Sequence, residues 1–215
     1  EARARPTAPG SPVTGGPVTG GTPPVSPDPG TPSGTTTPSD PDGRSPATTP
    51  SPSSPPEPTG LPQGFRTYAA PEGFSVAVPD GWRPVRTTRV SDLAYRVVLG
   101  ADGDDRTLAV TYSARVGPDP VAVWREDVEP GLVAAGGYRR LGAIRPTTYQ
   151  GREAADMEWT ATLRGTRVRT FGRGFLIGGG QGFSLRWTTP SADFDTAANR
   201  RALATALSTF RPPAA

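Results

Sequence analysis

The first 64 residues of the chain contain no aromatic side chain, and the first aromatic residue is Phe65. The same 64 residues hold 18 of the 28 prolines and 10 of the 27 glycines. A segment with so few apolar side chains cannot bury enough surface to offset the conformational entropy of ordering. We therefore expect residues 1–64 to be a disordered Pro/Thr/Ser/Gly-rich linker. Residues 65–215 form a single domain in this prediction, and they are numerous enough for one hydrophobic core.

Three types of side chain are missing, and their absence excludes many functions. The chain has no Cys and no His, and all 23 basic residues are Arg. It therefore lacks a thiolate nucleophile, a Ser-His-Asp triad and the usual zinc and haem ligands. Without Lys it also lacks a Schiff-base residue and a Walker-type phosphate lysine. We expect a domain that binds and does not catalyse, with no cofactor, no metal and no catalytic residue.

The charge pattern and the lack of apolar runs limit the partners. The net charge is +3, and no run of basic residues is longer than two. Because nucleic-acid-binding domains cluster their basic residues, we expect no nucleic-acid partner. No apolar run is long enough to span a membrane. The chain begins at Glu1 and not at Met, so we expect it to touch the membrane only through an anchor upstream of residue 1.

Period-two alternation of apolar residues predicts the strands of the domain. Asp- and Gly-rich turns separate them, and the second and third form a hairpin. The expected strands are residues 74–78, 95–99, 107–115, 138–149, 152–164, 167–177 and 183–189.

Two helices are expected. Asp119 and Pro120 provide an N-cap and a first helical residue, and a kink is expected at Pro130. A second helix should span residues 195–209. The predicted core-facing stripes are Val121, Trp124, Val128 and Leu132 in the first helix, which ends at Gly136-Gly137, and Leu203, Leu207 and Phe210 in the second.

Adjacent strands joined by tight turns, with helices packed on them, define the fold class. We predict an α+β fold with an antiparallel sheet of six to seven strands, preceded by the linker. The one-sided alternation predicts that one face of the sheet is covered and the other is wetter.

Charged residues near one hairpin are the main candidate site. The candidate anion-binding patch comprises Arg164, Arg167, Arg169 and Arg173, of which the last three share a face of a regular strand. Pairing of these residues with Asp156 and Glu158 across the sheet explains them equally well. Asp156 and Glu158 could alternatively be the paired carboxylates of a glycosidase-like site. Because they alternate with core residues, we expect them to lie on the exposed face of their strand.

Other candidates have simpler explanations. Residues 178–182 lack the Lys-Ser/Thr of a phosphate loop and are interpreted as a hairpin turn. The spacing of Asp102, Asp104 and Asp105 does not match a calcium loop, and these residues are interpreted as a solvated turn. The four Trp residues are assigned to the core, with Trp82 the one most suited to a pocket edge.

Several motifs resemble a known family. Residues 73–82 (GFSVAVPDGW) resemble the opening of Mog1/PsbP-like domains, in which a strand enters Pro-x-Gly-Trp. The remainder is similar to the C-terminal extracytoplasmic domain of actinobacterial receptor-type serine/threonine protein kinases. The matching pieces are Asp119-Pro120 with Trp124, Gly137-Tyr138, and residues 149–159, 182–187 and 208–212.

The resemblance implies a sensor or binding module outside the cytoplasm, tethered to the membrane behind a kinase. Its partner would be an unknown extracytoplasmic ligand or an envelope protein. The chain contains no kinase signature. Related lipoproteins begin with a lipobox Cys where this chain has Glu1, which favours the kinase reading over a lipoprotein-like scaffold. A small carboxylate-dependent hydrolase is the remaining alternative.

Overall fold

The computed structural model describes residues 60–90 and 92–214. Residues 1–59 of the expected linker lie outside the described residues. Ten strands lie in the described part: β1 (Phe65–Ala69), β2 (Ser75–Pro79), β3 (Arg83–Val90), β4 (Ala94–Gly100), β5 (Thr107–Ser113), β6 (Arg139–Arg140), β7 (Arg145–Tyr149), β8 (Arg152–Leu163), β9 (Thr166–Gly178) and β10 (Gln181–Pro190). The helical elements are α1 (Pro120–Ala122), the π-helical turn η1 (Val123–Val128), α2 (Glu129–Ala134) and α3 (Ala197–Thr209).

Two antiparallel sheets contain these strands. β1 pairs only with β2, and the large sheet has the order β3-β4-β5-β10-β9-β8-β6, with β7 also paired to β8. The predicted α+β class with an antiparallel sheet is confirmed. The strand number was underestimated, because β1 and β3 were not predicted. The expected strand 138–149 is divided into β6 and β7, and Gly142 lies between them with φ 75°.

Three consecutive hairpins share one kind of turn. Both central residues have positive φ in the β7–β8 turn (Gln150, Gly151), the β8–β9 turn (Arg164, Gly165) and the β9–β10 turn (Gly179, Gly180). Two such residues in a two-residue loop define a type I′ turn, whose twist matches that of the flanking strands. The interpretation of residues 178–182 as a hairpin turn is confirmed.

The main core lies between the large sheet, α3 and the β1–β2 hairpin. Trp82 is fully buried there and stacks on Trp187 at 5.2 Å between ring centroids, so its expected place at a pocket edge was wrong. Phe210 is buried as predicted, but Leu203 and Leu207 are only partly buried at the margin of this core. Ala202 and Ala206 form the closest face of α3, because small residues let the helix approach the sheet.

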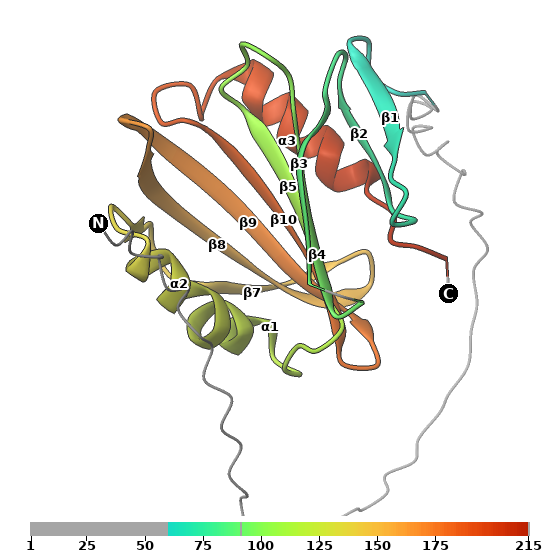
Figure 1. Cartoon of the computed structure of the whole chain (residues 1–215), viewed down its shortest axis with the longest axis vertical. Coiled ribbons are helices and arrows are strands. Elements are labelled where there is room, and N and C mark those ends of the chain that lie inside the picture. The colour runs from blue at the N-terminus through green and yellow to red at the C-terminus, as the bar shows by residue number, and fades with distance from the viewer. Residues whose placement is uncertain (1–59, 91, 215) are drawn as a thin grey trace, which may run out of the picture. The chain divides into compact units, whose positions relative to one another are not determined.

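A second, smaller core covers the opposite face of the sheet. Trp124 packs there with Ala155, Met157 and Trp159. Figure 1 shows α3 on one side of the sheet and the α1–η1–α2 segment on the other. Both faces of β8 are therefore covered, and the expectation of one wetter face fails for this strand. Asp156 is only 8% exposed.

The first expected helix is present in three pieces. Asp119 caps α1 by accepting a hydrogen bond from the Val121 N–H at 2.8 Å. The chain then widens into η1, in which the Glu129 N–H donates to the Trp124 carbonyl five residues earlier. Pro130 lies in the first turn of α2, where the missing N–H costs no helical hydrogen bond. The interruption therefore takes the form of a π-helical turn that ends just before Pro130.

Asp104, in the β4–β5 turn, gives the domain a testable acid sensitivity. Burial alone would raise the pKa of Asp104, but hydrogen bonds from Arg106 and Trp82 outweigh it and lower the pKa below its ordinary value. Asp104 therefore stabilises the fold above the unfolded-state pKa of about 3.9, and this contribution is lost as the pH falls through the lower folded-state pKa. We expect Asp104→Asn to lower the unfolding free energy by about 1 kcal/mol at pH 7.

Urea denaturation at several pH values checks this prediction. The difference between the wild type and Asp104→Asn should shrink as the pH falls from about 4 through the lower folded-state pKa, below which the carboxylate is protonated in both states. A difference that stays constant from pH 7 to pH 2 would contradict it.

Candidate ligand groove on the sheet face

The structure places the four predicted Arg residues around the β8–β9 hairpin but gives three of them protein partners. Arg173 donates two hydrogen bonds of 2.7 Å to Asp156. Arg169 binds Glu158 at 2.6 Å and Asp195 at 3.0 Å. Arg167 donates to the Thr160 hydroxyl at 2.9 Å, and Arg164 is an exposed turn residue. The cross-strand pairing is present, and anion binding by these four residues stays a prediction.

The two candidate carboxylates lie beside each other on the α3 face of β8. The expected exposed position was wrong for Asp156, which forms a largely buried ion pair with Arg173. Hydrogen bonds from Arg173 to Asp156 raise the pKa of Arg173 above its usual value. Glu158 is bound by Arg169 and lies 3.7 Å from Arg145. Both carboxylates therefore serve in ion pairs that join neighbouring strands.

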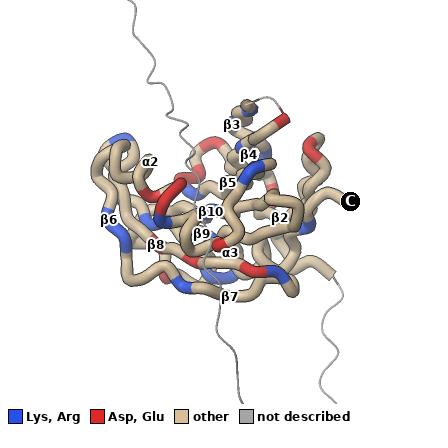
Figure 2. The backbone as a smooth tube through the Cα atoms, turned by 90° about the horizontal axis from the view of Figure 1, so that it is seen from below, with Lys and Arg blue, Asp and Glu red and all other residues tan. Residues whose placement is uncertain are grey.

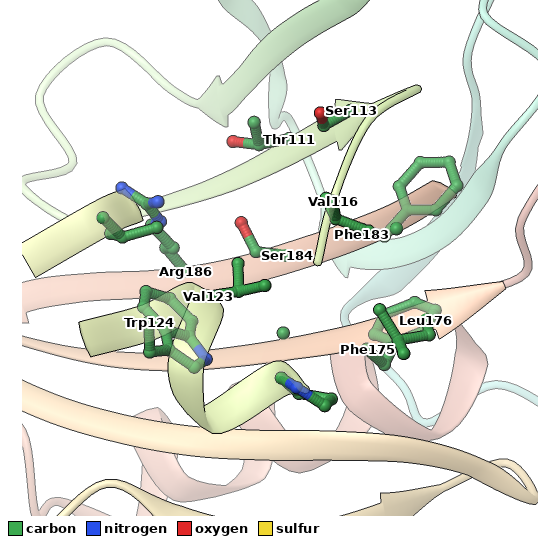
Figure 3. Close-up of a pocket in the computed structure, with 14 residues that line it drawn as sticks. Thr111, Ser113, Val116, Val123, Trp124, Phe175, Leu176, Phe183, Ser184 and Arg186 are labelled. Carbon is green, nitrogen blue, oxygen red and sulfur yellow. The ribbon is translucent and has the colours of Figure 1, made fainter. Parts of the chain in front are cut away.

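A pocket opens on the opposite face of the sheet, between η1 and the strands β5, β10 and β9. It has a volume of about 110 Å³. Val116, Val123, Val128 and Trp124 give it apolar walls, and Ser184 and Arg186 contribute polar groups from β10. Figure 3 shows Arg186 and Trp124 at one end of the pocket and Val116 towards the other, with Ser184 between them.

Two glycines of β9 let Trp124 lie against the sheet. A Cβ atom at Gly172 would be 2.6 Å from the Trp124 ring, and one at Gly174 would be 2.9 Å from its indole nitrogen. Side chains at these positions are therefore excluded while the ring stays in place. The indole N–H donates to the Ala155 carbonyl at 2.9 Å, which fixes the ring orientation. We call Gly172 and Gly174 the glycine shelf.

Arg186 lies at the pocket with no protein acceptor among the described residues. Its guanidinium carbon is 5.2 Å from the Trp124 ring centroid and 5.9 Å from that of Trp159. Its Nε is inaccessible to solvent and has no hydrogen-bond partner. Burial, with a smaller repulsion from Arg96, lowers the pKa of Arg186 below the usual value for Arg. A charged donor in this state favours an added acceptor.

Arg186 is part of a row of basic residues on the uncovered part of the sheet. The strand pairing places Arg96 of β4 and Arg86 of β3 on the same face as Arg186. Burial and the charge of Arg86 lower the pKa of Arg96. Within the described residues no hydrogen bond or ion pair joins any of the three to a carboxylate. Acidic and basic residues are interspersed over the rest of the domain (Figure 2), so this face is a local basic area.

We refer to the pocket together with Arg96 and Arg186 as the groove. Sequence reasoning missed it, because Trp124 was assigned only to a helix core and Arg186 to a strand motif. Two signals were available in the sequence. The Gly-x-Gly of residues 172–174 within a strand indicates close approach of another group. Arg186 lies at a period-two position between Leu185 and Trp187, on the face opposite to these core residues.

A family model described as the serine/threonine kinase C-terminal domain matches residues 66–212. No curated protein sequence matches the chain. The solution structure of cyanobacterial PsbP (CyanoP) from Synechocystis sp. PCC 6803 is similar, with a TM-score of 0.51 and 16% identity over 75% of this chain and 99% of that one. LpqN of Mycobacterium tuberculosis, described as involved in cell envelope biogenesis, gives a TM-score of 0.43 and 18% identity over 69% and 91% of the two chains.

The fold is that of a PsbP-like α+β domain. The sequence contains no kinase motif. This chain belongs to the family of serine/threonine kinase C-terminal domains. The matched residues correspond to the C-terminal domain of such proteins. Within the described residues, no helix has the length and apolar character that crossing a membrane requires.

Proposed function

We propose that this domain is the extracytoplasmic sensor or binding module of a membrane-anchored serine/threonine protein kinase. The groove is its binding site, and an extracytoplasmic ligand or an envelope protein is its partner. Membership of the kinase C-terminal family supports the link to a kinase. An anchor would lie upstream of residue 1, and residues 1–64 would connect it to the domain.

The observation that carries this proposal is the state of Arg186. Its buried Nε has no acceptor, and the adjoining pocket has apolar walls. A donor that is removed from water and left unpaired destabilises the fold. Its presence at the pocket therefore favours a role in binding. A bound anion would supply an acceptor for the Arg186 guanidinium and at the same time cover the apolar walls. This combination supports recognition as the role of the domain.

The location can be tested with the full-length kinase in intact cells. If the domain lies outside the cytoplasm, added protease should remove it while the kinase domain remains protected. A domain that becomes accessible only after the cells are lysed would contradict the proposed location.

The sensing role can be tested with a substitution in the groove of the same full-length kinase. We expect Arg186→Gln to change the phosphorylation of the kinase by about fivefold or more, a typical size for coupling between two sites. Arg200→Gln is the matched control. Arg200 is exposed on α3, so this substitution removes the same charge on the other side of the sheet. Quantitative phosphopeptide analysis measures the response. Equal phosphorylation in the wild type and both variants would contradict a signalling role for the groove.

A further inference from the structure

We infer that the groove binds a small amphiphile with one compact anionic head and an apolar group of about six carbons. This inference rests on the proposed function and specifies its ligand class. The chemistry follows from the two ends of the groove, which differ in character. One end offers guanidinium groups that have no carboxylate partner among the described residues. The other end is mainly aliphatic and aromatic, and the Ser113 hydroxyl there is already bonded to the backbone of Arg115.

The head of the ligand is defined by Arg186 and Arg96. These two side chains repel each other, since each lacks a carboxylate partner among the described residues and Arg96 contributes to the lowered pKa of Arg186. With the described residues, the Arg96 side chain forms only one hydrogen bond, a long one of 3.5 Å to the Thr111 hydroxyl. An anion placed at this end would relieve the repulsion and accept charge-assisted hydrogen bonds from both groups.

The geometry of the guanidinium groups indicates the kind of head. The planar fork of Arg matches the two oxygens of a carboxylate or the oxygens of a phosphate. The Ser184 side chain lies in the same pocket on the strand next to Thr111 and offers a further hydroxyl donor. A head with two or three oxygen acceptors therefore fits this end of the groove.

The tail of the ligand is defined by the rest of the pocket. Trp124, Val123 and Val116 give walls without a charge. The pocket volume of about 110 Å³ is somewhat below the engineered cavity of about 150 Å³ that holds a benzene molecule. It has room for a branched or linear chain of about six carbons or a single ring, and a longer chain would project into solvent.

Titration of the chain with four probes tests this inference. Hexyl phosphate and hexanoate carry both parts of the predicted ligand with different heads, inorganic phosphate carries only a head, and 1-hexanol carries only the tail. The indole N–H signal of Trp124, assigned with a Trp124→Phe variant, reports binding by NMR. We expect at least one of the first two probes to bind about tenfold or more tightly than phosphate or hexanol, since head and tail contribute together.

Two variants separate the contributions of head and tail. Arg186→Gln should weaken binding of the amphiphile by about tenfold to a hundredfold, because it removes charge-assisted hydrogen bonds. Ser184→Leu should also weaken it by filling the pocket, while it leaves both guanidinium groups in place. Arg200→Gln, on α3, should bind as the wild type does. The relative affinities of hexyl phosphate and hexanoate then show whether a phosphate or a carboxylate head is preferred.

Two results would overturn the inference. One is hexanol binding as tightly as both amphiphiles, with Arg186→Gln indistinguishable from the wild type. The other is no movement of the Trp124 signal with any probe. Neither result would by itself contradict the proposed sensor role, because the phosphorylation assay with Arg186→Gln and Arg200→Gln uses the natural ligand. Loss of an effect in that assay would contradict the sensor role even if the probes bind.

Discussion

Asp156→Ala is expected to lower the unfolding free energy by about 3 kcal/mol, because it leaves Arg173 without its carboxylate in a mostly buried position. The two side chains are 11% and 19% exposed and share two hydrogen bonds of 2.7 Å. The guanidinium of Arg173 also packs near the rings of Tyr149 and Phe171, at 5.3 and 5.6 Å from their centroids. It is therefore held in a place where water can replace only part of the lost interaction.

Urea denaturation followed by far-UV circular dichroism measures this effect. Asp102→Ala provides the control, because Asp102 pairs with Arg83 at the same 2.7 Å but its side chain is 86% exposed. Its loss should change the unfolding free energy by about 0.5 kcal/mol or less. Similar values for the two variants would show that burial does not control the strength of the Asp156–Arg173 pair.

Gly172→Ala is expected to lower the unfolding free energy by about 2 kcal/mol, since the new methyl group and the Trp124 ring compete for one position. The added Cβ would lie 2.6 Å from one atom of that ring and 3.0 Å from the Trp159 ring. The indole must move, and its hydrogen bond to the Ala155 carbonyl is then strained or lost. The same substitution should also weaken ligand binding in the groove.

Gly131→Ala in α2 separates this effect from the general consequences of removing a glycine. Apart from its chain neighbours and the backbone of its own helix, no atom of the described residues lies within 4 Å of the Cβ position at Gly131, and alanine is the better helix former. This variant should be more stable than the wild type by about 0.5 kcal/mol. If Gly172→Ala were as stable as Gly131→Ala, the glycine shelf would have no role in seating Trp124.

The parts of the fold that the sequence predicted are those with a strong local signal. The strands β8, β9 and β10 alternate apolar and polar residues over long stretches and turn at Gly-containing pairs, so their existence and order could be predicted. The Asp119-Pro120 start of the first helix was also correct. Some motifs of the family resemblance lie in these segments, and the others are residues 73–82, Gly137-Tyr138 and residues 208–212.

The missed elements lack such a signal for a physical reason. All eight residues of β3 are exposed, because this strand forms an edge of the sheet, and an edge strand with two wet faces shows no alternation. The burial of Asp156 was missed because Arg173 of β9 pairs with it on the α3 face, where the alternation predicted exposed polar residues. The second core under α1, η1 and α2 covers the other, apolar face of β8. Which face a distant helix covers is not encoded locally in a strand.

The groove could be predicted only in part. A Gly-x-Gly within a strand indicates that something approaches closely, but only the tertiary structure identifies the Trp124 ring as that group. The unpaired state of Arg186 depends on strand register, which brings Arg96 and Arg86 to its side and leaves every carboxylate elsewhere in the described part of the chain. Arg169 and Arg173 were singled out instead, since charged residues near a hairpin are visible in the sequence and their partners are not.

The position of β1 has a practical consequence for experiments. β1 packs with β2 and α3, and Arg201 of α3 donates to the Gln63 carbonyl just before it. The described chain thus enters the domain on the α3 side (Figure 1). The groove lies on the other side of the sheet, beside η1. A domain that begins at Gly60 and is captured on a biosensor chip through that end should therefore leave the groove accessible to an injected analyte.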